Sequence, residues 1–430
     1  MRVLLLNQVF YPDVAATAQH ADDLARHLVK HGHEVHAIAS RALYGEKGAS
    51  LPKHETVDGV QIHRVGTSLF GKAGILARLA DFALFYLLAT VKCFTIKKPD
   101  VVVCFTTPPF IALVGRFMRL LRGTKYVYWV MDLYPDIAVA CGVMQPRSPM
   151  TRFFESVNRY CLKRADRVVV LGRCMLGRVR GKGVDHGQVQ HIGVWSDADE
   201  LEPVERADNP LAQEWGLGDR FVVMYSGNFG LGHDVDTFLR AAERLRTNPD
   251  IAFLFVGGGK KKETVDTFVR EKGLENCIVA GFQPRERLGA SLSCADVHLA
   301  TLLEGVEGIM VPCKLFGIMG AGRATIYIGH PDSELSRVLD EYDCGWTIRQ
   351  GDVDGLVSLI ERLASDREGT REAGERARGA LSRAYAREVA CERWRRALED
   401  VVAGVALDPS DVEQTPSTVE DDEPVAATGG

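Results

Sequence analysis

Residues 304–323, EGVEGIMVPCKLFGIMGAGR, have the types and order that could bind an anion. Residues 296–300 have the pattern of a buried strand before them, and residues 313–320 are predicted to be helical. A loop that enters a helix offers unpaired backbone N–H groups, and Lys314 adds a positive charge there. We therefore expect a phosphate at this loop, with Glu304 or Glu307 beside it to accept hydrogen bonds from sugar hydroxyls. The alternative is an exposed loop with a surface lysine.

Two further glycine loops follow predicted strands in the same half of the chain. Gly227-Asn228-Phe229-Gly230 follows residues 221–225, and residues 257–262 combine three glycines with three lysines. Glycine allows backbone N–H groups to approach an oxyanion closely. Each loop alone is a weak signal, since an exposed loop or a basic helix start would look the same. Three such loops at strand ends of one domain favour an anion site.

Known nucleotide-binding patterns do not fit these loops. The chain has no GxxxxGK[ST] motif, and residues 227–232 depart from the GxGxxG spacing. The acidic residue expected about 20 positions later in a dinucleotide site is also missing. A dehydrogenase is therefore disfavoured.

In the first half of the chain, Asp132 and Asp136 follow a predicted strand at residues 125–130. A carboxylate at a strand end can act as a general base, and Asp132, nearer the strand, is the better candidate. Asp136 is expected to cap the next helix. A loop containing Tyr11, Ala15 and Ala16 follows the first predicted strand and could also touch a phosphate, although alanine approaches less closely than glycine.

Strand and helix patterns alternate on both sides of a break. Residues 2–6, 34–39, 59–65, 101–105, 125–130, 167–171 and 189–192 predict strands, with residues 59–65 of edge character. The pattern stops near residues 193–219, which are rich in Asp, Glu, Pro and Asn, and it restarts at residue 221. We expect an α/β protein with two Rossmann-like parallel-sheet domains whose loop ends face a central cleft.

The expected boundaries are 1–195 for the first domain, 196–219 for a linker, 220–387 for the second domain and 388–405 for a final helix. Residues 406–430, acidic and poor in apolar side chains, are predicted to be a disordered tail.

Composition excludes several classes of protein. The chain of 430 residues is 46% hydrophobic and 25% charged, and its net charge of −5 disfavours nucleic-acid binding. Its ten cysteines form no CxxC pair, which indicates reduced thiols in a cytoplasmic setting. The apolar run at residues 4–6 is too short for a signal peptide, and residues 82–91 are too short to span a membrane.

The segments that carry chemistry resemble a known family. FYPDVAATAQHADDLARHLVKHGHEVHAIAS, DLYPDIAVACGVM, ADRVVVLGRCM, YSGNFGLGHDVDTFLRAAERL, FVGGGKKK and GVEGIMVPCKLFGIMGAGRATIYIGHPDSE are similar to glycosyltransferase family 4, of the GT-B fold. The resemblance covers about residues 1–400 and is closest to bacterial members that build exopolysaccharide, colanic acid and O-antigen. It implies a retaining hexosyltransferase that uses a nucleotide sugar, UDP- or GDP-linked, without a metal or another cofactor.

The resemblance also implies site residues. Catalytic roles fall on Asp132 and Glu307, and Tyr11, Ala15, Ala16 and Trp195 lie on the acceptor side. The family's last helix commonly crosses back to the first domain, which suits residues 388–405. The donor contacts, taken from the strand-end segments, are Gly227, Asn228, Gly230, His233, Gly258, Lys260, Glu307, Gly308, Lys314 and Glu334.

The chain departs from the family pattern at three places. Ala15 and Ala16 stand where many relatives have glycine, and Met131 stands where many have histidine. The common pair of glutamates eight residues apart is missing, because Leu315 comes eight residues after Glu307. The exopolysaccharide subgroup shares the last two features. Two other readings stay open: a nucleotide-sugar epimerase of the same fold, and a catalytically silent scaffold of a polysaccharide assembly complex.

The partners expected are a nucleotide-sugar donor and a lipid-linked saccharide acceptor. Residues 69–98 contain an apolar helix flanked by lysines and arginines, a composition that suits an anionic interface. We therefore expect peripheral binding at the inner face of the cell membrane. The alternative is that residues 82–91 form a core helix of the first sheet.

Overall fold

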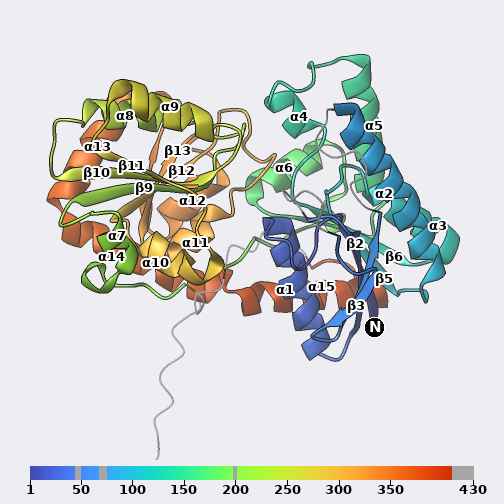
Figure 1. The fold of residues 1–430 in the computed structure, drawn as a ribbon. Helices are drawn as coiled ribbons and strands as arrows, with labels where there is room; N and C mark the ends of the chain where they lie inside the picture. Colours follow the sequence, from blue (N-terminus) through green and yellow to red (C-terminus); the bar gives the residue numbers. More distant parts are fainter. Residues whose placement is uncertain (44–49, 67–74, 197–200, 409–430) are drawn as a thin grey trace, which may run out of the picture.

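The computed structural model describes residues 1–43, 50–66, 75–196 and 201–408, and it contains two α/β domains (Figure 1). The first sheet has the strand order β3-β4-β2-β1-β5-β6-β7-β8, parallel except where β3 pairs with β4. Its strands are β1 Arg2–Leu6, β2 Glu34–Ser40, β3 His54–Val57, β4 Val60–Val65, β5 Val101–Cys104, β6 Lys125–Val130, β7 Arg167–Val170 and β8 Val189–His191.

The second sheet is parallel throughout, in the order β11-β10-β9-β12-β13-β14. Its strands are β9 Phe221–Asn228, β10 Ile251–Gly258, β11 Cys277–Ala280, β12 Val297–Thr301, β13 Ala324–Ile328 and β14 Gly345–Ile348. The predicted fold class is confirmed: strands alternate with helices, and the inner strands of each sheet, such as β5 and β12, are largely apolar and buried on both faces.

Helices cover both faces of each sheet. Those of the first domain are α1 Ala16–Lys30, α2 Ile75–Thr95, α3 Ala112–Arg122, α4 Asp136–Ala140, α5 Pro149–Lys163 and α6 Arg173–Gly181. Those that follow are α7 Pro210–Glu214, α8 Asp236–Arg244, α9 Lys262–Lys272, α10 Leu288–Ser293, α11 Lys314–Gly320, α12 Glu334–Glu341, α13 Val353–Ser365, α14 Arg367–Ala380 and α15 Arg387–Ala403.

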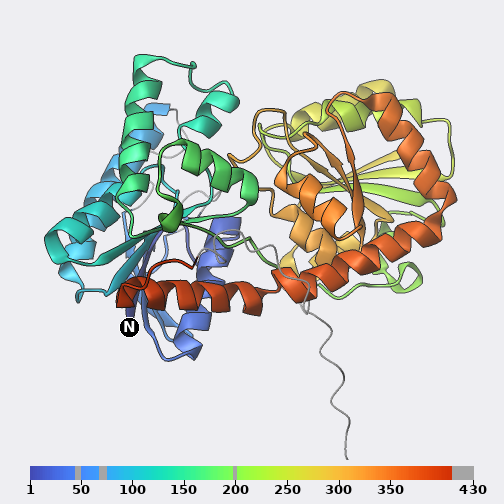
Figure 2. The ribbon, with the colours of Figure 1, turned by 180° about the vertical axis from the view of Figure 1, so that it is seen from behind.

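Helix α15 lies against the first domain, although it follows the last helix of the second (Figure 2). Glu388 pairs with Lys30 of α1 at 3.2 Å, and the indole of Trp394 packs 4.3 Å from that of Trp129 on β6. Burial of these large rings fixes α15 on the first domain, so the chain crosses between the domains twice.

Two local predictions were wrong. β4 lies inside the sheet, and the edge is β3, which the sequence reading missed because its exposed residues lack an apolar pattern. The predicted linker contains α7, whose start is capped by Asn209, with Leu211 and Leu217 buried beneath the second sheet.

In the part of the chain that the structure describes, no helix has the length and apolar character needed to cross a membrane. Of the predicted tail at residues 406–430, residues 409–430 lie outside the described residues, while Leu407 is 8% exposed and packs in the core of the first domain.

Candidate active site between the domains

The ammonium group of Lys314 is the centre of the candidate donor site. Lys314 begins α11, and its Nζ donates a hydrogen bond to Tyr225 Oη at 2.6 Å while lying 3.8 Å from the centre of the tyrosine ring. No carboxylate of the described residues pairs with it. Burial lowers the pKa of Lys314 to about 7. A partly desolvated cation without a counter-ion is a ready site for an anion.

The first glycine loop lies beside this lysine. Gly227 has φ of +123°, and a Cβ there would lie 3.8 Å from Lys314 Cε. Tyr225 Oη donates to the carbonyl of Asn228 at 3.0 Å, so one chain of hydrogen bonds links Lys314 to the loop. The neighbouring strand end needs glycine too, because a Cβ on Gly257 would lie 2.0 Å from the carbonyl oxygen of Gly227. The structure therefore brings two predicted loops together around Lys314.

In the loop at residues 257–262, the lysine that turns toward the site is not Lys260, the one predicted. Gly258 pairs with Asn228 at the ends of β10 and β9, while Lys260 is exposed to solvent. Lys261 turns inward instead, and its Nζ donates to the carbonyl of His233 at 2.5 Å.

The imidazole of His233 is neutral in this setting. It is 5% exposed, its Nδ1 lies 2.6 Å from the carbonyl oxygen of Thr301, and burial with nearby Lys314 lowers its pKa to about 3. Gly230 packs against this ring, with its absent Cβ 3.4 Å from His233 Cδ2. His233 can therefore offer Nε2 as a neutral group, but it cannot serve as a cation.

The carboxylate of Glu307, predicted to be catalytic, is held inside its own loop. Its two oxygens accept hydrogen bonds from the backbone N–H of Gly305 at 2.9 and 3.0 Å. Arg178 of α6 lies 3.8 Å from one of those oxygens. Glu304 is exposed, and its backbone N–H donates to Gln350 Oε1 at 2.9 Å.

This loop contacts the first domain directly. Gly308 has φ of +68°, and a Cβ there would lie 2.6 Å from the carbonyl oxygen of Cys174, which only glycine avoids. The Leu133 N–H donates to the Ile309 carbonyl at 2.8 Å, and Asp132 forms an isolated β-bridge with Met310. The carboxyl ends of both sheets therefore meet at residues 304–310.

Asp132 lies at this junction and is itself part of the contact, through its bridge with Met310. Its backbone N–H donates to Thr106 Oγ1 at 3.3 Å. Burial raises the pKa of its carboxyl group to about 6. The prediction that Asp136 caps the next helix was wrong: Pro135 is the capping residue of α4, and Asp136 forms an ion pair with Lys182 at 2.8 Å.

Glu334 joins the two domains rather than facing Lys314. Its carboxylate accepts from the backbone N–H of Arg173 at 2.6 Å and from Arg173 Nε at 3.0 Å. Only 7% of Glu334 is exposed, so Arg173 occupies the group that was predicted to bind donor.

The four predicted acceptor residues do not share one environment. Tyr11 is 38% exposed, and Ala15 and Ala16 lie at the start of α1. Trp195 is 3% exposed and packs 5.7 Å from Trp129, with its Nε1 donating to Asp23 at 2.9 Å. The structure therefore places Trp195 in the core, which leaves it little surface for an acceptor.

Sequence reasoning missed Tyr225, Arg173 and Arg178. Tyr225 read as one more apolar strand residue, although its place before the first glycine loop was a usable signal. Arg173 and Arg178 act across the domain interface, which no local pattern reveals.

The carboxylates and histidines that could hold a metal have other partners in the part of the chain that the structure describes. Asp234, in an Asp-x-Asp sequence after β9, is 3% exposed and accepts from the N–H groups of Asp236 and Thr237. His27, His31 and Glu392 come together where α1 meets α15, but both oxygens of Glu392 accept from Arg395 at 2.7 Å.

Two family models match the chain and decide its identity. The model described as "Glycosyl transferase 4-like domain" matches residues 16–195, and that described as "Glycosyl transferases group 1" matches residues 209–380. The chain belongs to the family 4 glycosyltransferases of the GT-B fold. It is therefore a glycosyltransferase, as the resemblance implied.

Two curated relatives of this glycosyltransferase come from bacteria. It is 30% identical to the probable glycosyltransferase WbjE of Pseudomonas aeruginosa over 269 residues. This match covers 62% of this chain and 66% of the relative. It is 23% identical over 374 residues to the putative colanic acid biosynthesis glycosyl transferase WcaI of Escherichia coli (strain K12), covering 84% and 92%.

Solved structures share the fold of this glycosyltransferase at low identity. Sucrose-phosphate synthase from Thermosynechococcus elongatus superposes with a TM-score of 0.77 and 16% identity, over 94% of this chain and 100% of that one. Anabaena Alr3699/HepE in complex with UDP-glucose gives a TM-score of 0.70 and 14% identity, over 93% and 100%.

Replacing Arg178 tests the contact between α6 and the loop of residues 304–310 in this glycosyltransferase. Arg178 donates to the carbonyl of Glu307, and its Nη2 lies 3.3 Å from the carbonyl oxygen of Gly305. We expect Arg178→Ala to raise the KM for donor about tenfold, with a smaller change in kcat, because the loop loses charge-assisted hydrogen bonds. Steady-state kinetics measure this. A KM equal to that of the control Arg240→Ala, which removes an exposed pair with Asp236, would contradict it.

Proposed function

We propose that the chain is a retaining hexosyltransferase of surface polysaccharide biosynthesis. Its donor is a UDP- or GDP-linked sugar, and its acceptor is a lipid-linked saccharide. The nucleotide sugar is a substrate, so the reaction needs no separate cofactor.

One observation carries the proposal: Lys314 is a partly buried cation that lacks a carboxylate partner among the described residues and lies beside Gly227. A diphosphate would supply the missing negative charge. As the sugar leaves, negative charge grows on that diphosphate, and a fixed ammonium group stabilises it more strongly in a desolvated site than in water. The UDP-glucose complex of Alr3699/HepE and the name of WcaI support the same donor class and pathway.

Residues of the first domain complete the proposed site. Asp132 contacts the loop of residues 304–310 through its backbone bridge with Met310, and this position supports a role for its carboxylate toward a sugar or an acceptor hydroxyl. The second domain's Lys314 and glycine loop hold the diphosphate. The contacts of Arg178 and Gly308 bring the two halves together.

A nucleotide-release assay with purified protein tests the function. We expect release of UDP or GDP from a panel of nucleotide hexoses, with a large increase when lipid-linked acceptor is added. Interconversion of donors without acceptor would identify an epimerase, and the absence of turnover with every donor and acceptor tried would favour a scaffold.

The same assay tests the proposed metal independence. Lys314 supplies the positive charge that a divalent ion would otherwise bring to the diphosphate. We expect turnover to persist in EDTA; activity lost in EDTA and restored by manganese or magnesium would refute this part of the proposal.

A lipid-linked acceptor requires that the enzyme work at a membrane. We therefore propose peripheral association with the inner face of the cell membrane, and the surface responsible is argued below.

A further inference from the structure

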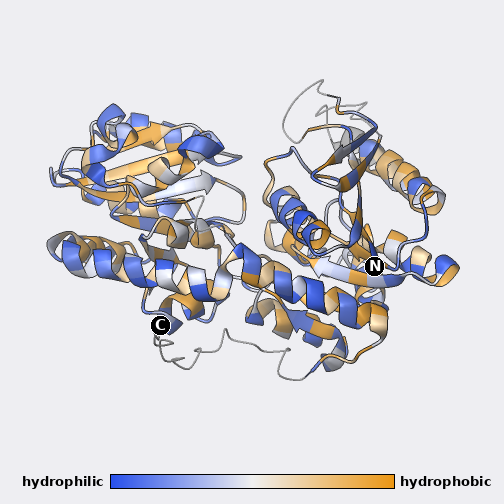
Figure 3. Ribbon diagram, turned by 90° about the horizontal axis from the view of Figure 1, so that it is seen from below, coloured by the Kyte–Doolittle hydropathy of each residue, from blue (hydrophilic) through white to orange (hydrophobic). Residues whose placement is uncertain are grey.

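Large apolar side chains are exposed together on one side of the first domain, where α2, α3 and α5 lie (Figure 1). Nine of the fifteen large apolar residues exposed in the described structure belong to these three helices. Figure 3 shows a largely hydrophobic helix at this side of the molecule, beside helices of mixed hydropathy. The exposed apolar side chains on α2 and α3 are Leu87, Val91, Phe94, Phe117, Leu120 and Leu121. Met150, Phe153 and Tyr160 extend the same surface along α5.

Helix α2 serves both the core and this surface. Phe85 and Cys93 are buried against the sheet, whereas Leu87 and Val91 are 63% and 53% exposed on the opposite face of the helix. The core-helix alternative for residues 82–91 is therefore correct for one face and does not account for the other. An isolated exposed leucine is ordinary, but three adjacent helices with apolar outer faces indicate a contact surface.

Positive charge accompanies the apolar side chains. Between residues 82 and 122 the chain has six lysines and arginines and one aspartate, although its net charge is −5 overall. The cations gather where α2, α3 and α5 end, at the amino-terminal edge of the sheet: Lys97, Lys98, Arg119, Arg122, Lys163 and Arg164.

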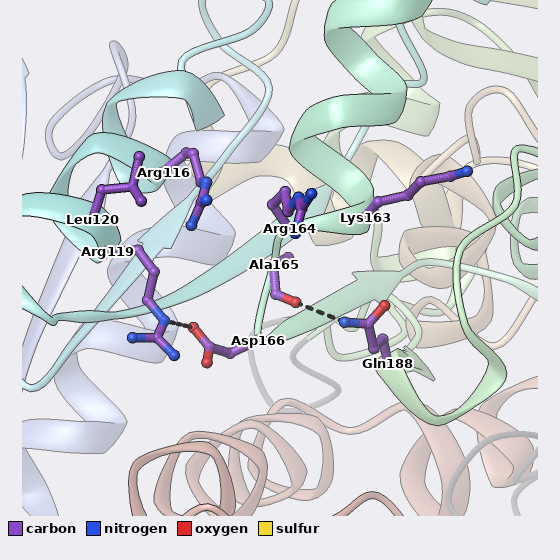
Figure 4. Close-up of a pocket in the computed structure, with 8 residues that line it drawn as sticks. All are labelled: Arg116, Arg119, Leu120, Lys163, Arg164, Ala165, Asp166 and Gln188. Carbon is purple, nitrogen blue, oxygen red and sulfur yellow. Dashed lines mark hydrogen bonds and ion pairs between the residues drawn. The ribbon is translucent and has the colours of Figure 1, made fainter.

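A cavity of about 540 Å³ opens between the ends of α3 and α5 (Figure 4). Arg116, Arg119, Lys163 and Arg164 line it, with Asp166 as the single acid. Arg119 already pairs with Asp166 at 2.9 Å. Lys163 and Arg164 have no carboxylate partner among the described residues, so the cavity has an excess of positive charge.

Exposed apolar side chains beside unpaired cations are complementary to an anionic lipid surface. The apolar side chains can enter the headgroup region, and the cations can bind lipid phosphates. We propose that α2, α3 and α5 dock the protein on an anionic phospholipid membrane, with a lipid phosphate in the cavity at Arg116 and Arg164.

The helices of this surface all belong to the first domain, so docking through them would involve no element of the second domain. This docking rests on the proposed function, because a lipid-linked acceptor gives the enzyme a reason to bind a membrane. It adds the surface that binds and the class of lipid. Vesicle binding is measured without turnover, so its failure and the failure of the proposed function can be told apart.

Sedimentation with vesicles tests the surface. We expect the full chain to bind phosphatidylcholine vesicles that contain phosphatidylglycerol, to bind pure phosphatidylcholine weakly, and to dissociate at high salt. Leu120→Ser with Leu121→Ser, and Lys163→Glu with Arg164→Glu, should each weaken binding about tenfold or more. These side chains are exposed, so the melting temperature and the turnover of a detergent-dispersed acceptor should not change.

Matched controls lie on the second domain. Phe282→Ser removes an apolar side chain that is 65% exposed, and Arg246→Glu with Arg270→Glu reverses two exposed charges. We expect neither control to alter vesicle binding. Equal losses in controls and surface variants would overturn the assignment to α2, α3 and α5.

Other outcomes would also overturn the proposal. One is a protein that stays in the supernatant with anionic vesicles at low salt, whether or not it binds inorganic phosphate. Another is self-association in sedimentation velocity that the Leu120 and Leu121 variant abolishes without any effect on vesicles, which would make this surface an interface between two copies of the chain.

Discussion

Lys314→Ala is expected to lower kcat/KM for the donor by about 100- to 1,000-fold, the usual effect of removing one preorganised electrostatic contact to a developing anion. Tyr225 fixes the amino group by a 2.6 Å hydrogen bond, so Nζ is in position before the donor binds. Steady-state kinetics with saturating acceptor measure the loss. Turnover that stays within about threefold of the unchanged enzyme would remove the phosphate role from Lys314.

The fold should tolerate this change. Burial lowers the pKa of Lys314 from 10.5 to about 7. Below pH 10.5, where the unfolded chain carries the ammonium form, this burial therefore costs the folded protein stability. Lys314→Met, which keeps the packing on Tyr225 but not the charge, should therefore melt no lower than the unchanged protein at pH 8. It should lose as much activity as Lys314→Ala, which separates charge from packing.

The same pKa predicts how donor binding depends on pH. The free enzyme loses the Lys314 proton as pH rises through about 7, whereas a bound diphosphate favours the charged form. Donor affinity should then fall by up to about tenfold per pH unit above 7, until the pKa of the complex is reached. Lys314→Ala should not show this dependence.

Asp132→Asn is the second large effect that we expect. A positioned general acid or base contributes about 100- to 10,000-fold, so kcat should fall by about that range if the carboxylate takes part in transfer. Because burial raises the pKa of Asp132 to about 6, activity of the unchanged enzyme should decline as pH falls below 6, where the carboxyl group is protonated. The Asn variant should have low activity without this acid limb.

Stability provides the control for this variant. Because the pKa of Asp132 is raised from 3.8 to about 6, its cost to folding free energy grows as pH rises above 3.8 and is complete above about 6. Neutral asparagine should therefore leave the melting temperature at pH 8 unchanged or higher. Lys182→Met, which breaks the nearby pairs with Asp136 and Glu155, should lower stability instead. A kcat of Asp132→Asn within a few-fold of normal would exclude a role in transfer.

The sequence was sufficient for the fold class, since apolar strands and amphipathic helices repeat in an order that only a parallel sheet satisfies. It also singled out Lys314 and the loop at Gly227, which the structure brings side by side, because a strand end followed by glycine and a helix start is a local pattern. The short α7 was missed, since Asn209 and Pro210 read as linker residues until Leu211 and Leu217 had a sheet to pack against.

Only the tertiary structure decided which side chains are available. Trp195 and Glu334 looked like ligand contacts in the sequence. In the structure, Trp129 packs against Trp195 and Arg173 forms a hydrogen bond with Glu334, although both partners are distant along the chain. The exposed faces of α3 and α5 likewise follow from the absence of a covering element among the described residues, although each helix alone reads as an ordinary amphipathic helix. The periodicity of a sequence shows which face of an element is apolar. Burial and pairing depend on what packs against that face, and the packing partners are far apart in the sequence.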